Sequence, residues 1–66
     1  MEVQVNGIKQ EVELETNVSG LLAMLSISSL GIAVAVNGAV VPKTQWDRAE
    51  LQANDSITII KATQGG

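Results

Sequence analysis

Cysteine and histidine are both absent from this chain of 66 residues, and each absence removes a kind of chemistry. Without cysteine there is no disulfide framework, thiolate nucleophile, iron–sulfur cluster or zinc finger. Without histidine, the commonest general base and the usual imidazole ligand of metals are missing. We therefore expect a protein that is not an enzyme by itself and that binds no metal ion or cofactor of its own.

Basic residues and long apolar runs are also scarce. Four cations leave a formal net charge of −3 and a pI near 4.5, so no basic surface can neutralise phosphates, and nucleic acid is not an expected partner. No apolar stretch approaches the roughly 20 residues of a membrane span, and the first residues do not resemble a secretion signal. We expect a cytoplasmic protein with no membrane partner.

Trp46 is the only aromatic residue, and aliphatic side chains supply most of the 45% hydrophobic content. Tryptophan is enriched in binding hot spots, so Trp46 is a candidate for a partner-binding surface. The alternative, which we favour, is that Trp46 covers one end of a small core. Asp47, Arg48 and Glu50 beside it are better explained as solvated surface than as catalytic groups.

The first fifteen residues predict a β-hairpin. Val3 and Val5 alternate with polar residues, and Asn6-Gly7 then tolerates the positive φ of a tight turn. Val12 and Leu14 alternate with glutamates, which predicts a returning strand with its aliphatic side chains on the core face.

A short helix follows this hairpin. Thr16-Asn17 offers a capping side chain, and Gly20 weakens the helix by roughly 1 kcal/mol relative to alanine. The residues at i, i+3, i+4 and i+7 form one apolar stripe: Val18, Leu21, Leu22 and Leu25. A helix this short must be stabilised by docking on a sheet, and the stretch from residue 26 to 31 ends it.

The second half of the sequence predicts further strands. The apolar run 32–36 is typical of a buried strand, and Asn37-Gly38 predicts a tight turn. Pro42 cannot donate to a sheet ladder, so residues 39–41 should form a short strand at an edge. A helical turn is possible over 44–48, and residues 57–60 read as the final strand after a turn at 54–55.

This order of elements predicts an α+β fold, a mixed sheet with one helix packed across one face, and the ubiquitin-like β-grasp is its simplest topology. Residues 1–61 would form the β-grasp domain, and residues 62–66 a flexible C-terminal tail that reaches about 17 Å when extended. Ile60 alternates outward from Ile57 and Ile59, so we expect it on a partner-binding surface opposite the helix.

Two glycines, Gly65 and Gly66, end the sequence and are its main chemical feature. A carboxylate is a poor acyl donor because it is anionic at neutral pH, so chemistry at Gly66 needs prior activation. Transfer of AMP from ATP would form a mixed anhydride, and a sulfur nucleophile could then displace AMP to leave a thiocarboxylate, 1-thioglycine. Residues without a Cβ can thread a narrow channel, so Gln64, Gly65 and Gly66 are expected to enter a partner's active site. That partner would supply ATP, Mg²⁺ and catalysis.

Several segments, at their spacing in so short a chain, resemble the thiamine-biosynthesis sulfur carriers of the ThiS family over nearly the whole length. The segments are residues 18–22 with Leu25, residues 32–38, Val40-Val41-Pro42 with Trp46, and Gly65-Gly66. The resemblance implies a β-grasp fold and adenylylation of Gly66 by an E1-like activating enzyme of the ThiF type. It also implies sulfur from a donor such as a cysteine desulfurase system, and delivery to a thiazole synthase of the ThiG type.

Two departures and two alternatives accompany this resemblance. Asn54-Asp55 stands where Gly-Asp is common, a mild change because asparagine also tolerates the left-handed region, and Thr63-Gln64 replaces smaller or aliphatic residues. The first alternative is a sulfur carrier of the molybdopterin-synthase type. The second is a non-catalytic ubiquitin-like protein modifier or interaction module, which a fold alone does not exclude.

Overall fold

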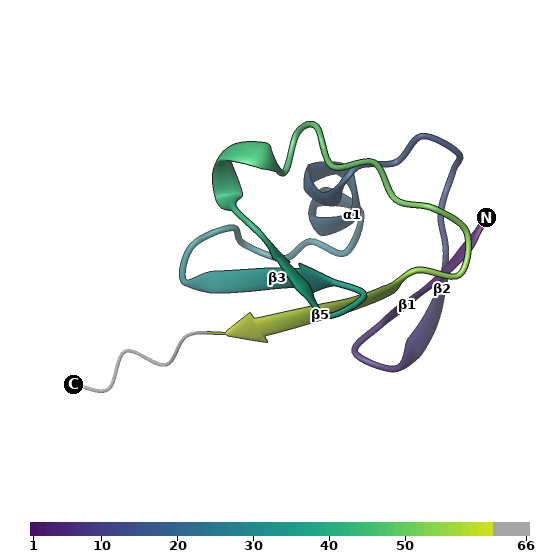
Figure 1. The fold of residues 1–66 in the computed structure, drawn as a ribbon, viewed down its shortest axis with the longest axis horizontal. Helices are drawn as coiled ribbons and strands as arrows, with labels where there is room; N and C mark the ends of the chain where they lie inside the picture. The colour runs from purple at the N-terminus through teal and green to yellow at the C-terminus, as the bar shows by residue number, and fades with distance from the viewer. Residues whose placement is uncertain (62–66) are drawn as a thin grey trace.

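The computed structural model describes residues 1–61, which form a five-stranded sheet and one α-helix (Figure 1). The predicted division into a domain over residues 1–61 and a tail over residues 62–66 remains a prediction, because residues 62–66 lie outside the described part of the chain. In chain order the elements are β1 (Glu2–Val5), β2 (Ile8–Glu11), α1 (Val18–Met24), β3 (Ile32–Val36), β4 (Ala39–Val41), a 3-10 helix (Lys43–Gln45) and β5 (Ser56–Lys61).

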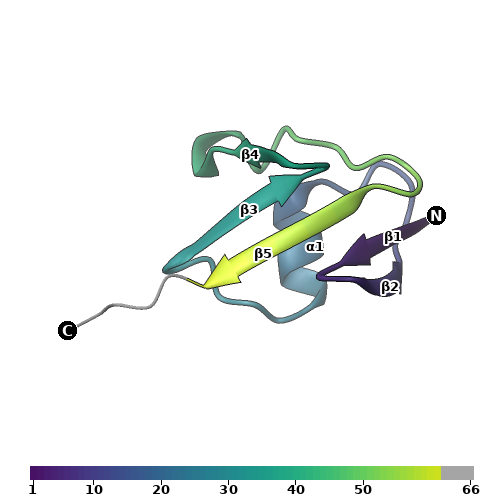
Figure 2. The same ribbon diagram turned by 60° about the horizontal axis from the view of Figure 1, so that its bottom comes forward.

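The last strand of the chain, β5, occupies the centre of the sheet. The strand order is β2-β1-β5-β3-β4, with β5 parallel to β1 and antiparallel to β3. The two hairpins, β1–β2 and β3–β4, therefore flank β5 on either side. Figure 2 views the sheet with α1 crossing behind it, so the helix covers one face. This is the mixed sheet with one helix across one face that the sequence predicts.

The core lies between α1 and the covered face of the sheet. Its buried side chains come from every part of the described chain: Val3, Val5, Val12, Val18, Leu21, Leu22, Val34, Trp46, Leu51 and Ile57. Three members of the predicted helical stripe are among them, and the fourth, Leu25, packs against the cluster. The helical stripe is thus confirmed as the core-facing side of α1.

Asn17 caps α1 as the sequence predicts. Its backbone is extended, and its side-chain oxygen accepts a hydrogen bond from the Gly20 backbone N–H at 2.7 Å. Asn17 also donates through its amide nitrogen to the Asp47 carbonyl at 3.1 Å. One side chain therefore satisfies a free donor at the helix start and attaches the helix to the segment after β4.

The returning strand of the first hairpin differs from the prediction. It runs over Ile8–Glu11, not through Val12 and Leu14, because the two-residue turn at Asn6-Gly7 places Ile8 directly opposite Val5. Val12 lies beyond the strand and is buried, with its N–H bonded to the Met1 carbonyl at 2.8 Å. Leu14 is 76% exposed, so its expected place on the core face is wrong.

Strand β3 is less buried than its apolar run suggests. Val34 is buried, but Ala33 on the other face is exposed, because only one face of the sheet is covered by α1. The Asn37-Gly38 turn is confirmed, with φ of 52° and 86°. Strand β4 is a short edge strand that ends immediately before Pro42, also as predicted.

Trp46 is a core residue. Its side chain is 4% exposed, and its indole N–H donates to the Val41 carbonyl at 2.9 Å. It follows the 3-10 helix, which lies close to the predicted helical turn. This placement agrees with the favoured interpretation, in which Trp46 packs over one end of the core.

Candidate functional site

The predicted reactive residues, Gln64, Gly65 and Gly66, lie outside the described residues. The site is therefore built from its base, the C-terminal end of β5. Lys61 is the last residue of this strand and stands opposite Ile32 at the start of β3. The C-terminal end of β5 is thus held on one edge by β3.

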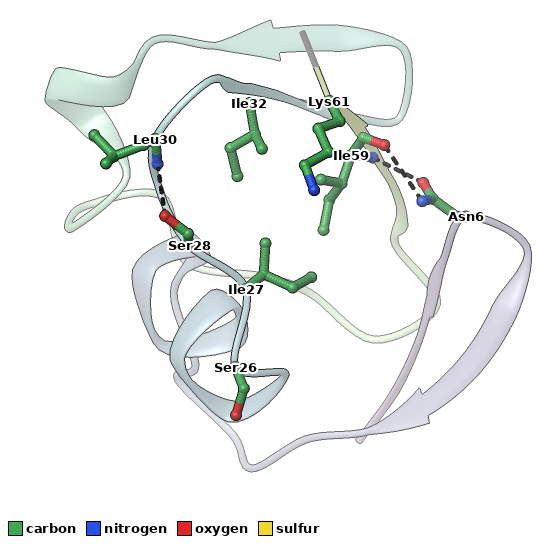
Figure 3. A pocket seen from close by; sticks show the side chains of 8 residues that line it. All are labelled: Asn6, Ser26, Ile27, Ser28, Leu30, Ile32, Ile59 and Lys61. Atoms are coloured by element: carbon green, nitrogen blue, oxygen red, sulfur yellow. Dashed lines mark hydrogen bonds between the residues drawn. The ribbon is translucent and has the colours of Figure 1, made fainter. Parts of the chain in front are cut away.

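Asn6 holds the other edge of β5 near this point. Strand β1 ends at Val5, and beyond it the Asn6 side chain acts as a short extension of the ladder (Figure 3). Its oxygen accepts from the Ile59 N–H at 2.8 Å, and its amide nitrogen donates to the Ile59 carbonyl at 3.3 Å. Both edges of β5 are therefore fixed within two residues of Lys61.

Asn37, from the second hairpin turn, performs the same task at the start of β5. Its side-chain oxygen accepts from the Ser56 N–H at 2.9 Å, and its amide nitrogen donates to the Asp55 carboxylate at 2.9 Å. The other oxygen of Asp55 accepts from the Gln52 N–H at 2.7 Å, which closes the turn before β5. Asn54 within that turn has a φ of 69°, so it adopts the left-handed conformation expected of it.

Ile60 points away from α1, as the alternation along β5 predicts. It is 58% exposed, whereas Ile57 is buried and Ile59 is half-buried on the helix side. Ile60 stands opposite Ala33 in β3, and Ala35 in turn stands opposite Val40 in β4, which is 71% exposed. We call these four residues, Ala33, Ala35, Val40 and Ile60, the open-face patch.

The contributions of Ala33 and Val40 to the open-face patch were not visible in the sequence. A run of five apolar residues shows no alternation, so the exposed face of β3 becomes clear only from its register with β5. Trp46, the other predicted surface residue, is buried in the core and does not reach this patch.

The acidic and basic residues beside Trp46 do not form a reactive cluster. Asp47, Arg48 and Glu50 are exposed, and Asp47 accepts a hydrogen bond from the Ser19 hydroxyl on α1. Within residues 1–61, no three side chains of the metal-binding types come together as a metal site. Nor does that part of the chain contain a helix with the length and hydropathy needed to cross a bilayer.

Comparison with models of known protein families identifies the family of this chain. The family model described as the ThiS family matches residues 3–66. The chain belongs to the ThiS family. The match spans both hairpins, the helix and the terminal glycines, so it covers the segments on which the resemblance was based.

Solved structures agree with this ThiS assignment. The crystal structure of a thiamine biosynthesis protein (ThiS) from Geobacter metallireducens is 28% identical, with a TM-score of 0.85 and full coverage of both chains. A solution structure of a thiamine biosynthesis protein from the same organism is 26% identical, with a TM-score of 0.76 over 100% of this chain and 88% of that one. Among proteins of curated function, no sequence matches. The structural likeness confirms the predicted β-grasp fold.

Proposed function

We propose that this ThiS-family chain is a sulfur carrier in thiamine biosynthesis and that its Gly66 carboxylate carries the sulfur as a thiocarboxylate. The observation that supports the proposal most directly is the family match, which extends through Gly66. The same match favours the thiamine pathway over a carrier of the molybdopterin-synthase type.

The proposed chemistry has two steps at one carbonyl carbon. A Gly66 carboxylate oxygen attacks the α-phosphorus of ATP and releases pyrophosphate, which leaves an acyl adenylate. A sulfur nucleophile then attacks the carbonyl carbon, and the C–O bond to AMP breaks. When the nucleophile is the outer sulfur of a donor persulfide, this attack leaves an acyl disulfide. A thiol then attacks the donor's sulfur and forms a disulfide with it, which supplies the two electrons that release the thiocarboxylate. The terminus then carries sulfur in place of one carboxylate oxygen.

The catalytic groups for these steps belong to partners. An E1-like adenylating enzyme of the ThiF type would bind ATP and Mg²⁺. The Mg²⁺ ion would neutralise charge on the phosphates. A donor such as a cysteine desulfurase system would supply the sulfur, and a thiazole synthase of the ThiG type would accept it. In this scheme the chain is a cytoplasmic substrate and Gln64, Gly65 and Gly66 enter each partner's active site.

The open-face patch is the proposed contact for the adenylating enzyme outside the tail. Its aliphatic side chains lie on the central strand β5, which ends at Lys61, and on β3 and β4, which follow on one side of it. An active site that surrounds Gly66 must therefore lie near the end of this surface.

Intact-mass spectrometry tests the proposal directly. The protein is incubated with ATP, a sulfur source and a ThiF-type enzyme shown to be active on another carrier, beside a variant that lacks Gly66. The expected result is a mass gain equal to exchanging one oxygen for sulfur, in the full chain only. Attachment of the chain to lysines of other proteins, with no sulfur at its terminus, would instead establish the protein-modifier function.

A further inference from the structure

A groove of about 390 Å³ opens on the helix side of the sheet, where β5 ends (Figure 3). The side chains of Ile32, Ile59 and Lys61 reach into it from the sheet, and Ile27 reaches toward them from the segment after α1. Leu30, which is 76% exposed, lies at the rim of the groove, with its side chain pointing outward (Figure 3). We call this the tail-root groove, because Lys61 is both a lining residue and the last residue before positions 62–66.

Hydrogen bonds hold the walls of the tail-root groove in place. The Ile27 N–H donates to the Leu22 carbonyl at 2.9 Å, and the Leu30 N–H donates to the Ser28 hydroxyl at 3.2 Å. The Asn6 side chain fixes Ile59 on the opposite wall. A partner that binds a preformed groove loses less free energy to ordering than one that binds a mobile loop.

The chemistry of the groove selects one kind of occupant. Four of the eight lining residues are aliphatic, and three of these, Ile27, Ile32 and Ile59, reach toward one another, so an apolar side chain would be favoured between them. Lys61 is the one charged group among the described lining residues, and no carboxylate within residues 1–61 forms an ion pair with it. An apolar side chain next to a carboxylate would therefore match both parts of the groove.

The groove lies close to the point from which the chain continues to Gly66, so a partner that acts on Gly66 must come near it. Gly66 lies five residues beyond Lys61, a reach of about 17 Å at full extension. An enzyme that closes around the Gly66 carboxylate thus brings its own surface to the tail-root groove.

We propose that the tail-root groove is a docking site for the adenylating enzyme, which inserts an apolar side chain there and pairs a carboxylate with Lys61. This inference rests on the proposed function and adds a contact on the face of β5 opposite the open-face patch. Because Ile59 and Lys61 face the helix side whereas Ile60 faces away, the two contacts can be altered separately.

The test compares two leucines with the same exposure. Leu30 and Leu14 are each 76% exposed, but Leu14 precedes α1 whereas Leu30 follows it and lines the groove. Binding of Leu30→Glu, Lys61→Glu and the control Leu14→Glu to a ThiF-type enzyme is measured by calorimetry without ATP. KM and kcat for adenylylation are then measured with ATP.

We expect Leu30→Glu and Lys61→Glu to raise both Kd and KM tenfold or more, with kcat changed less than twofold. Leu14→Glu should stay within twofold of the parent protein, and Lys61→Arg should retain binding. Thermal melts of all variants check that the fold is intact, and we expect it to be, because Leu14, Leu30 and Lys61 are all exposed.

Equal binding by Leu30→Glu and Leu14→Glu would overturn the groove as a docking site, even if the parent protein is adenylylated normally. A parent protein that binds the enzyme through this groove but is never adenylylated would overturn the proposed function alone. A parent protein that neither binds nor reacts, with an enzyme active on another carrier, would overturn both.

Discussion

Asn6 and Asn37 each form part of a turn and also bond to β5 with their side chains. Glycine would satisfy the positive φ at either position, but it has no side chain, whereas each asparagine amide accepts from a backbone N–H and also donates to a second oxygen. Such positions combine a conformational requirement with a hydrogen-bonding one. Their residue type is therefore more restricted than a turn alone would require.

Asn6→Gly separates these two requirements. The substitution keeps the turn but removes both hydrogen bonds to Ile59, so we expect the free energy of unfolding to fall by about 1–2 kcal/mol. Urea denaturation followed by circular dichroism measures the change. Asn54→Gly is the matched control, because Asn54 has a φ of 69° and its side chain makes no hydrogen bond within residues 1–61. The control should be neutral or slightly stabilising, and equal losses in both variants would contradict the role of Asn6.

Trp46 is the second residue whose substitution is informative. Trp46→Ala should lower the free energy of unfolding by about 3–5 kcal/mol, because a large buried side chain is lost and a cavity remains. That loss is a large part of the stability of so small a domain. Trp46→Phe keeps most of the buried area but loses the hydrogen bond to Val41, and should cost less. Urea denaturation by circular dichroism measures both, and a Trp46→Ala protein as stable as its parent would exclude the core role.

Helix α1 is seven residues long, so it depends on its cap and on docking. Asn17→Ala removes the bond to Gly20 and the bond to Asp47, and should destabilise the protein by about 1 kcal/mol or more. Asn17→Asp keeps the acceptor for Gly20 but loses the donor to Asp47, and should recover most of the loss. Thermal unfolding of the parent protein, Asn17→Ala and Asn17→Asp gives their order of stability. If Asn17→Asp were as unstable as Asn17→Ala, the bond to Asp47 would be the dominant one.

The elements differ in how far sequence reasoning could predict them. Helix α1 was predictable because its cap and apolar stripe are both local signals. Strand β2 was not, since Lys9, Gln10 and Glu11 show no alternation and their strand is set by the turn before them. The exposure of one face of β3 also required the register of the whole sheet.

Some features of the candidate site could likewise be predicted from the sequence, and others could not. The chemistry expected at Gly66 and the outward orientation of Ile60 follow from neighbouring residues in the sequence. The tail-root groove does not, because Ile27, Ile32 and Ile59 come from three separate segments that the sheet brings together. Such a site has no local pattern to reveal it.

At the scale of the molecule, the open-face patch is tested by Ile60→Glu. We expect at least tenfold weaker binding to the adenylating enzyme, with the free energy of unfolding changed by less than about 0.5 kcal/mol because the site is exposed. Ile8→Glu is the control, since Ile8 is 64% exposed and lies on the edge strand β2, away from the patch. Calorimetric titration and thermal melts provide the two readouts. Equal adenylylation kinetics for Ile60→Glu and the parent protein would remove this patch from the interface.

The central position of β5 also determines when the domain can form. Gln4 and Val5 pair with Ser56 and Ile57, so strands from the two ends of the described chain must meet in the middle of the sheet. Contacts so distant in sequence form slowly and late. During synthesis, both hairpins must wait for β5 to leave the ribosome before they can be joined, and until then Val3 and Val34 have no central strand to complete their sheet. A chain that stops before Ser56 therefore lacks the strand that unites the fold and becomes a target for proteolysis.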